Sequence, residues 1–282
     1  MDALHAVLIA ILQGATELFP VSSLGHAVIV PAMFQWRINQ HDPSFLPFLV
    51  LLHAGTSVAL LLYFWRDWWA MASGVLGLSG AEERRRSRRL FLRIVVATIP
   101  AVILGFVFNH FFRELFENPF YAILFLALNG VMLLMGENLR REVTEGEARG
   151  LDSLTIPDAL MVGVWQCGAL FPGISRSGAT IVGGLLRGVD HAAAAHFSFL
   201  IALPIIVGAT VLEVPKLLRA PLEPGVLHLA MVAALIAGVT AFLSTWFLMR
   251  YFRGNDRWSL GPFGIYCIAA AAGAAVWLRF GA

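Results

Sequence analysis

The chain has 282 residues, of which 59% are hydrophobic and 13% are charged, and its mean hydropathy is +0.76. This composition excludes a soluble globular domain and indicates an integral membrane protein built from helices. The formal net charge of +2 says little about partners, because in a membrane protein the location of charge matters more than its sum. We expect membrane lipids, and no nucleic acid, as partners. The two cysteines, Cys167 and Cys267, are too few for a disulfide framework and lack the spacing of metal ligands.

Six apolar stretches are long enough to cross a membrane as helices, at roughly 46–65, 90–110, 119–137, 195–214, 226–249 and 261–279. Two further apolar regions, about 3–35 and 157–190, are broken near the middle by the polar stretches "TELFPVSSLGH" and "FPGISRSGAT". Irregular backbone at membrane depth is tolerated only where protein or a water-filled cavity satisfies its polar groups. We therefore predict that each broken region forms a re-entrant helical hairpin.

Basic residues predict the orientation of the chain. They are concentrated after the first, third and fifth spans, whereas the alternate loops contain fewer of them. The positive-inside rule places the basic loops in the cytoplasm, so the first hairpin would enter from outside and the second from the cytoplasm. The residues concerned are "EERRRSRR" (82–89), predicted as a solvated loop, and Arg140, Arg141, Arg149, Arg250, Arg253 and Arg257.

The two broken regions also indicate an internal repeat. A shift of 153 residues aligns Gln13 with Gln166, Ser22 with Ser175, Gly25 with Gly178 and Gly55 with Gly208. We predict a single membrane domain, 1–282, with one repeat half at about 1–140 and the other at about 155–282. Three spans per half make the second copy inverted, so the expected fold is all-α, with six transmembrane helices and two re-entrant hairpins in an inverted-topology repeat.

Candidate site residues lie in both hairpins, and inverted repeats place their working site near the midplane, where broken helices meet. Gln13 and Glu17 are four residues apart and therefore share one face of a helix. The first hairpin contributes Gln13, Glu17, Ser22, Ser23 and His26, and the second contributes Ser175, Arg176, Ser177 and Thr180.

These residue types suit the chemistry of a phosphate. The Arg176 guanidinium matches phosphate oxygens, and the small residues around it let backbone N–H groups approach an anion. Structural alternatives are a link from Arg176 to backbone carbonyls, an interfacial position for Glu17, and capping of the second half-helix by Ser22 or Ser23. A hydroxyl, a base and a carboxylate beside an anion site indicate phosphoryl transfer or hydrolysis of a lipid phosphate.

Other polar residues within or near the spans are expected to have structural roles. We predict packing or interhelical hydrogen bonds for His53 and Asn129, because neither lies in a broken region.

The motifs "QGATELFPVSSLGH" and "PGISRSGAT" resemble the two signature regions of the undecaprenyl-diphosphate phosphatase family, the bacitracin-resistance membrane proteins of bacteria. Length and hydropathy agree along essentially the whole chain. The resemblance implies hydrolysis of undecaprenyl diphosphate to undecaprenyl phosphate and inorganic phosphate, which recycles the lipid carrier for peptidoglycan and other envelope polymers. It also implies a location in the bacterial plasma (inner) membrane, with a site that opens to the outer face.

A divalent cation, Mg²⁺ or Ca²⁺, is a further implication of the resemblance. Gln13 stands where many members have Glu, which argues against metal binding at this position and leaves Glu17 as the candidate ligand. Leu24 stands where relatives often have Thr, so this chain has one hydroxyl fewer.

The expected mechanism combines both motifs. Arg176 holds the diphosphate, Ser23 attacks the terminal phosphorus, and His26 and Glu17 move the proton and orient the nucleophile. Phosphate binding is also expected from Ser175, Ser177, Thr180, Ser22 and Gln13.

Two alternatives stay open at this point. In one, His26 is the nucleophile. In the other, the protein is a lipid-phosphate transporter or flippase, because inverted repeats with broken helices are common among transporters. A homodimer is one option for the oligomeric state, which the sequence leaves open.

Overall fold

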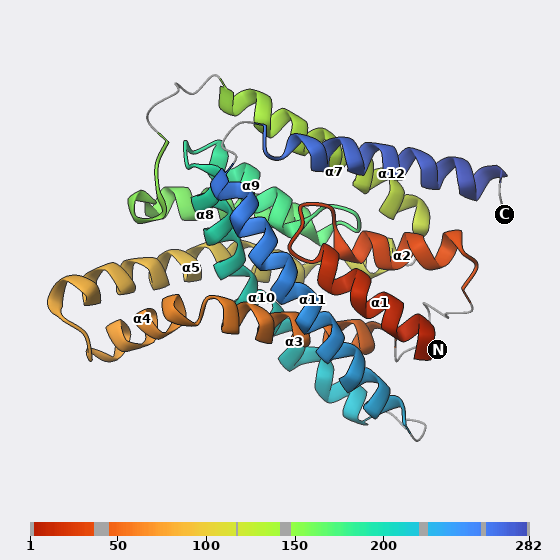
Figure 1. Ribbon diagram of the computed structural model, residues 1–282, viewed down its shortest axis with the longest axis horizontal. Coiled ribbons are helices and arrows are strands. Elements are labelled where there is room, and N and C mark those ends of the chain that lie inside the picture. Colours follow the sequence, from red (N-terminus) through yellow and green to blue (C-terminus); the bar gives the residue numbers. More distant parts are fainter. Residues whose placement is uncertain are drawn as a thin grey trace.

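The computed structural model describes residues 3–36, 45–116, 118–141, 148–219, 225–254 and 258–280, and almost all of them are helical (Figure 1). In chain order the helices are α1 (Ala3–Thr16), α2 (Ser23–Met33), α3 (Phe45–Tyr63), α4 (Trp65–Leu76), α5 (Ala81–Val107), α6 (Asn109–Phe116), α7 (Pro119–Arg141), α8 (Ile156–Gln166), α9 (Arg176–Leu185), α10 (His191–Arg219), α11 (Val226–Gly254) and α12 (Gly261–Phe280), with 3-10 turns at Leu151–Ser153 and Cys167–Leu170.

Five helices in the described part of the chain are long and apolar enough to cross a membrane. They are α5, α7, α10, α11 and α12. Each of the last four contains one of the predicted spans, and α5 contains all but the last three residues of the predicted span 90–110. The remaining predicted span, 46–65, falls on α3, which passes the same criterion only together with α4. The chain bends by 76° between those two helices. The structure is thus an all-helical membrane protein with five such spans, or six if the bent pair counts as one.

The segment 82–89 differs from the prediction of a loop, because its residues form the first turns of α5. Glu and Arg are strong helix formers, and Glu82 and Glu83 lie in the first turn, where the helix dipole favours negative charge. Arg88 donates from Nε to the Gly74 carbonyl and from Nη2 to the Val75 carbonyl, which satisfies carbonyls at the end of α4. Arg257 and the side chain of Arg141, also predicted as cytoplasmic, lie outside the described residues.

Two pairs of short helices form the broken regions. In the first pair, α1 and α2 flank residues 17–22, and in the second, α8 and α9 flank residues 167–175. Gly173 has a φ of +103°, and a Cβ there would lie 2.4 Å from the Ala122 carbonyl oxygen, so only glycine fits this turn. A Cβ on Gly25 would lie 3.0 Å from the Cα of Gly173, which shows how closely the two polar loops approach each other.

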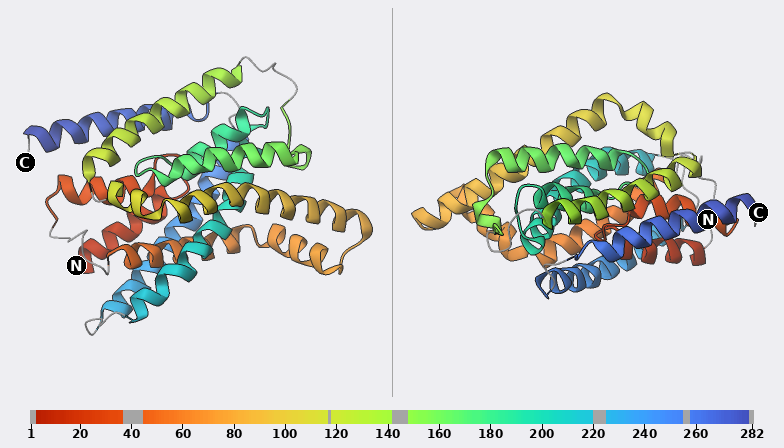
Figure 2. Two further views of the ribbon diagram at one scale, coloured as in Figure 1. Left: turned by 180° about the vertical axis from the view of Figure 1, so that it is seen from behind. Right: turned by 90° about the horizontal axis from the view of Figure 1, so that it is seen from above.

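The helices pack around these two pairs. Helix α1 lies against α11, and α8 lies against α5. Helix α3 packs between α10 and α11, while α7 and α12 lie side by side along one edge of the molecule (Figures 1 and 2). Helix α4 and the first half of α5 extend away from this body as an arm (Figure 2). The polar loops therefore meet inside a shell of apolar helices.

The start of the second pair is fixed by a buried aspartate. Thr155 and Asp158 form a capping box at the N-terminus of α8, and Arg149 and Arg187 each lie 2.7 Å from the Asp158 carboxylate. Burial alone would raise the pKa of Asp158, but hydrogen bonds from Arg149, Thr155 and Arg187 outweigh burial and hold that pKa below its ordinary value. This cluster anchors the N-terminus of α8, and the polar loop 167–175 follows the C-terminus of the same helix. The position of that loop therefore depends on the cluster.

Candidate active site

Serine caps begin both inner half-helices. The Ser22 side chain accepts a hydrogen bond from the Gly25 backbone N–H at 3.2 Å, and the Ser175 side chain accepts one from the Gly178 N–H at 3.1 Å. The predicted capping serine is therefore Ser22. Because Ser22 is the cap of α2, the next residue, Ser23, is the first residue of the helix and its hydroxyl is available for another partner.

Glu17 is the centre of the site. Its Oε2 accepts hydrogen bonds from Gln13 Nε2 at 2.7 Å and from Ser23 Oγ at 2.6 Å. All three residues are buried, and the spacing of Gln13 and Glu17 on one helical face is as predicted. A hydroxyl donating at this distance to a carboxylate is positioned to lose its proton to that carboxylate.

Arg176 approaches the same carboxylate from the other hairpin. Its Nη2 lies 3.6 Å from Glu17 Oε1, while its Nη1 donates to the Ser198 carbonyl at 3.2 Å. Nη2 is buried and makes no hydrogen bond with protein. Arg176 is the first residue of α9, as Ser23 is of α2, so the two half-helices present a cation and a hydroxyl to opposite oxygens of Glu17.

His53 also contacts Glu17, although the sequence predicted only packing or interhelical hydrogen bonds for it, and no place in the site. Its Nε2 lies 3.3 Å from Glu17 Oε2, and its Nδ1 lies 2.7 Å from the Leu49 carbonyl. A carbonyl only accepts, so Nδ1 carries a proton and Nε2 faces the carboxylate. An ionisable residue in the middle of an apolar span was the signal that could have identified His53.

His26 faces away from Glu17. Its Nδ1 donates to the Ser22 carbonyl at 2.7 Å, and its Nε2 lies 2.8 Å from the hydroxyl of Tyr266, on whose ring it stacks. The structure thus brings His53, and not His26, to the Ser23–Glu17 pair. A catalytic role for His26 stays a prediction.

The hydroxyl groups of the second motif connect the two hairpins. Ser175 Oγ and Ser177 Oγ lie 3.2 and 3.1 Å from the Phe19 carbonyl, which both can donate to. Thr180 Oγ1 donates within its own helix and lies 2.7 Å from Ser198 Oγ. These contacts assign structural partners to Ser175, Ser177 and Thr180, and phosphate binding by them stays a prediction.

Asn129 of α7 links both polar loops. Its Nδ2 donates to the Pro20 carbonyl at 2.9 Å, and its Oδ1 accepts from the Ser175 N–H at 2.9 Å. The interhelical hydrogen bonds predicted for this residue are confirmed. Because Pro20 precedes Ser23 by three residues and Ser175 precedes Arg176, Asn129 fixes the distance between the hydroxyl and the guanidinium.

The residues at the site do not fit a divalent cation held by protein ligands alone. In the part of the chain that the structure describes, no three His, Cys, Asp or Glu side chains come together in a way that could hold a metal ion. Mg²⁺ and Ca²⁺ prefer several oxygen ligands, whereas Glu17 supplies one carboxylate with a guanidinium 3.6 Å away. No catalytic step is therefore assigned to a metal ion, and the divalent cation stays a prediction that rests on the family resemblance.

Comparisons with known proteins identify the family of the chain. The chain matches the family described as "Bacitracin resistance protein BacA" over residues 6–273. It is 60% identical over 291 aligned positions to an undecaprenyl-diphosphatase of Granulibacter bethesdensis, covering 99% of this chain and 98% of that protein. It is 56% identical to an undecaprenyl-diphosphatase of Acidiphilium cryptum over the full length of both, and 51% identical to one of Gluconacetobacter diazotrophicus over 96% of this chain and 95% of that protein.

Proposed function

The chain belongs to the bacitracin resistance protein BacA family, and from this membership we propose that it is an undecaprenyl-diphosphatase. It hydrolyses undecaprenyl diphosphate to undecaprenyl phosphate and inorganic phosphate. The names of its relatives favour this enzyme over the transporter alternative. The observation that carries the chemistry is the 2.6 Å hydrogen bond from Ser23 Oγ to Glu17 Oε2, beside the Arg176 guanidinium.

The first step is attack by Ser23 on the terminal phosphorus. The Ser23 proton moves to Glu17, the bond to the bridging oxygen breaks, and Glu17 returns the proton to the departing undecaprenyl phosphate. Arg176 Nη2, which has no hydrogen-bond partner in the protein, neutralises charge on the phosphoryl oxygens. His53 keeps the Glu17 carboxylate turned towards Ser23.

The second step releases phosphate from a phosphoserine intermediate. Water attacks the phosphorus, its proton passes to Glu17, and Glu17 then protonates the Ser23 oxygen as phosphate leaves. The sum of the two steps consumes one water molecule and restores every side chain. Attack by His26 is less well supported, because its Nε2 already faces the Tyr266 hydroxyl and not the Glu17 carboxylate.

The two halves of the chain, about 1–140 and 155–282, form an inverted repeat in this proposal. Ser22 and Ser175, which are 153 residues apart, cap α2 and α9. Each accepts a hydrogen bond from the backbone N–H of the glycine three residues later, and Ser23 and Arg176 directly follow the two caps. The packing is also exchanged between the halves, as an inverted repeat requires, because α1 of the first half lies on α11 of the second and α8 of the second half lies on α5 of the first.

The proposal extends to the surroundings of the protein. The protein lies in the bacterial plasma membrane, its site opens to the outer face, and its partner is the polyprenyl diphosphate within the lipid. A homodimer is part of the proposal only as a hypothesis, and light scattering of the purified protein in detergent measures the oligomeric state.

Phosphate release by the purified protein from undecaprenyl diphosphate in detergent tests the function. We expect steady release with the intact protein and none with Ser23→Ala. Absence of release by the intact protein, with lipid transfer across vesicles instead, would favour the transporter. Chelation followed by addition of Mg²⁺ or Ca²⁺ in the same assay measures whether a cation takes part.

A further inference from the structure

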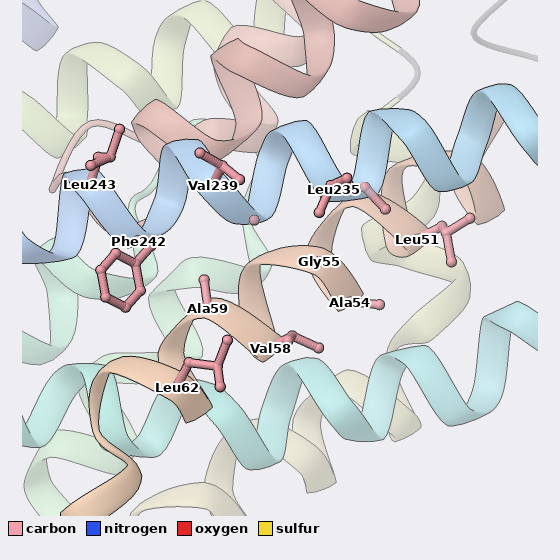
Figure 3. Close-up of a pocket in the computed structure, with 12 residues that line it drawn as sticks. Leu51, Ala54, Gly55, Val58, Ala59, Leu62, Leu235, Val239, Phe242 and Leu243 are labelled. Atoms are coloured by element: carbon pink, nitrogen blue, oxygen red, sulfur yellow. The ribbon is translucent and has the colours of Figure 1, made fainter.

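An apolar groove lies between α3 and α11 (Figure 3). Its volume is about 500 Å³, and every residue lining it on both helices is apolar. Leu51, Val58 and Leu62 line it on α3, and Leu235, Val239 and Phe242 line it on α11. A diphosphate finds no polar partner among these side chains, whereas a hydrocarbon chain does not need one.

The floor of the groove is formed by small residues. A Cβ on Gly55 would lie 2.0 Å from the Ala234 carbonyl oxygen, so the backbones of α3 and α11 touch at this point. Gly238 lies against the Gly55 carbonyl in the same way. Larger side chains, among them Leu62, Leu235 and Phe242, line the groove around this contact (Figure 3).

The helices that form the groove also hold the active site. Helix α3 carries His53, whose Nε2 contacts Glu17, and the next residue, Ala54, lines the groove. On α11, Ala237 lies directly against Gly14 of α1, the neighbour of Gln13, and the next residue, Gly238, lines the groove. The polar site and the apolar groove thus border the same part of both helices.

The groove has a direction. Leu51 lies near the level of His53, and Leu62 lies 11 residues further along α3, which is about 16 Å of helix. Beyond Leu62 the rings of Tyr63 and Phe242 meet edge to face at 5.5 Å. A chain that starts beside His53 can therefore run along α3 as far as this pair of rings.

We propose that this groove binds the isoprenoid chain of the substrate while Arg176 and Ser23 hold its diphosphate. The inference rests on the proposed function, because the proposed substrate joins a diphosphate and a hydrocarbon chain in one molecule. A methyl-branched chain fits a channel whose walls are Leu, Val and Phe and whose floor is glycine and alanine. Burial of its surface in the groove contributes to substrate affinity and so makes the enzyme prefer long chains.

Substitution of a wall residue tests the proposal. Val58→Trp places a large ring over the groove, and Val102→Trp on α5 is the matched control, because the two valines are 55% and 53% exposed and Val102 does not line the groove. Each variant is assayed for phosphate release from undecaprenyl diphosphate and from dimethylallyl diphosphate, whose five-carbon group ends before it can reach Val58, five residues and about 7.5 Å of helix beyond His53.

We expect Val58→Trp to raise KM for undecaprenyl diphosphate by about tenfold, the ratio that follows from losing roughly 50 Å² of apolar burial. It leaves hydrolysis of dimethylallyl diphosphate unchanged, and Val102→Trp changes hydrolysis of neither substrate. If the two variants had the same KM for undecaprenyl diphosphate, a bilayer acyl chain and not the substrate would fill the groove, and the proposal would be overturned. An equal effect of Val58→Trp on both substrates would overturn it as well. Failure of the unsubstituted protein to hydrolyse either diphosphate would instead refute the proposed function.

Discussion

Replacement of Ser23 by alanine removes one oxygen atom. The size of the resulting fall in rate distinguishes two possible roles of Ser23. As a nucleophile, Ser23 forms the bond to phosphorus. As a positioning residue, it only holds the Glu17 carboxylate through the 2.6 Å hydrogen bond. Both roles predict a slower enzyme, so the magnitude has to be worked out for each.

A hydrogen bond to a charged acceptor contributes about 1.5–3 kcal/mol. Loss of that contribution alone lowers the rate by about 10- to 150-fold. Loss of a nucleophile that acts together with its base costs far more, on the order of 10⁶-fold. We therefore expect Ser23→Ala to lower kcat by more than about 10³-fold.

The assay is phosphate release from undecaprenyl diphosphate, combined with acid quenching and mass spectrometry of the peptide that contains Ser23. Ser57→Ala is the control, because Ser57 also donates from a buried residue, at 2.8 Å to the Ala54 carbonyl, but is not among the contacts of Glu17. We expect the control to lose at most about tenfold, the cost of one neutral hydrogen bond. Residual activity of Ser23→Ala within about 150-fold of the intact enzyme, or phosphate found on His26, would refute the serine mechanism.

Three further changes test the supports of the site. Asn129→Leu leaves the Ser175 N–H and the Pro20 carbonyl without partners. We therefore expect the free energy of unfolding, measured by thermal unfolding in detergent, to fall by about 2–6 kcal/mol. An unchanged Tm would contradict the role of Asn129 as a link between the two polar loops. His53→Ala should lower kcat by about 10- to 100-fold with KM unchanged, whereas a rise in KM alone would assign His53 to substrate binding. Asp158→Asn should lower Tm by several degrees at pH 7. Because the folded protein holds the pKa of Asp158 below its ordinary value, the difference should persist above about pH 4 and shrink as the pH falls further.

The sequence predicts those parts of the site that are local. Gln13 and Glu17 share a face because an α-helix repeats every 3.6 residues, and Ser22 caps α2 because a serine before a helix satisfies a free N–H. Hydropathy likewise locates α5, α7, α10, α11 and α12, since a membrane requires about 20 apolar residues per crossing.

The remaining parts depend on tertiary packing. His53 lies on a helix that is apolar all round, so periodicity marks no face that would turn it towards Glu17. Asn129 acquires its two partners from segments 109 and 46 residues away, at Pro20 and Ser175. The 76° bend between α3 and α4 also has no proline or glycine to announce it, because Phe64 stands at the break.

The pairing of Glu17 with Arg176 has a consequence for biogenesis. Arg176 follows Glu17 by 159 residues, so at bacterial rates of synthesis it leaves the ribosome roughly 8–32 s later. A glutamate at membrane depth is costly without a partner. Its neutral hydrogen-bond donors Gln13 and Ser23 are made first, and His53, which follows it by 36 residues, is made well before Arg176. Until α9 is inserted, the nascent chain contains the hydroxyl of Ser23 and its base Glu17 but not the phosphate-binding Arg176. The newly made first half therefore has no catalytic activity.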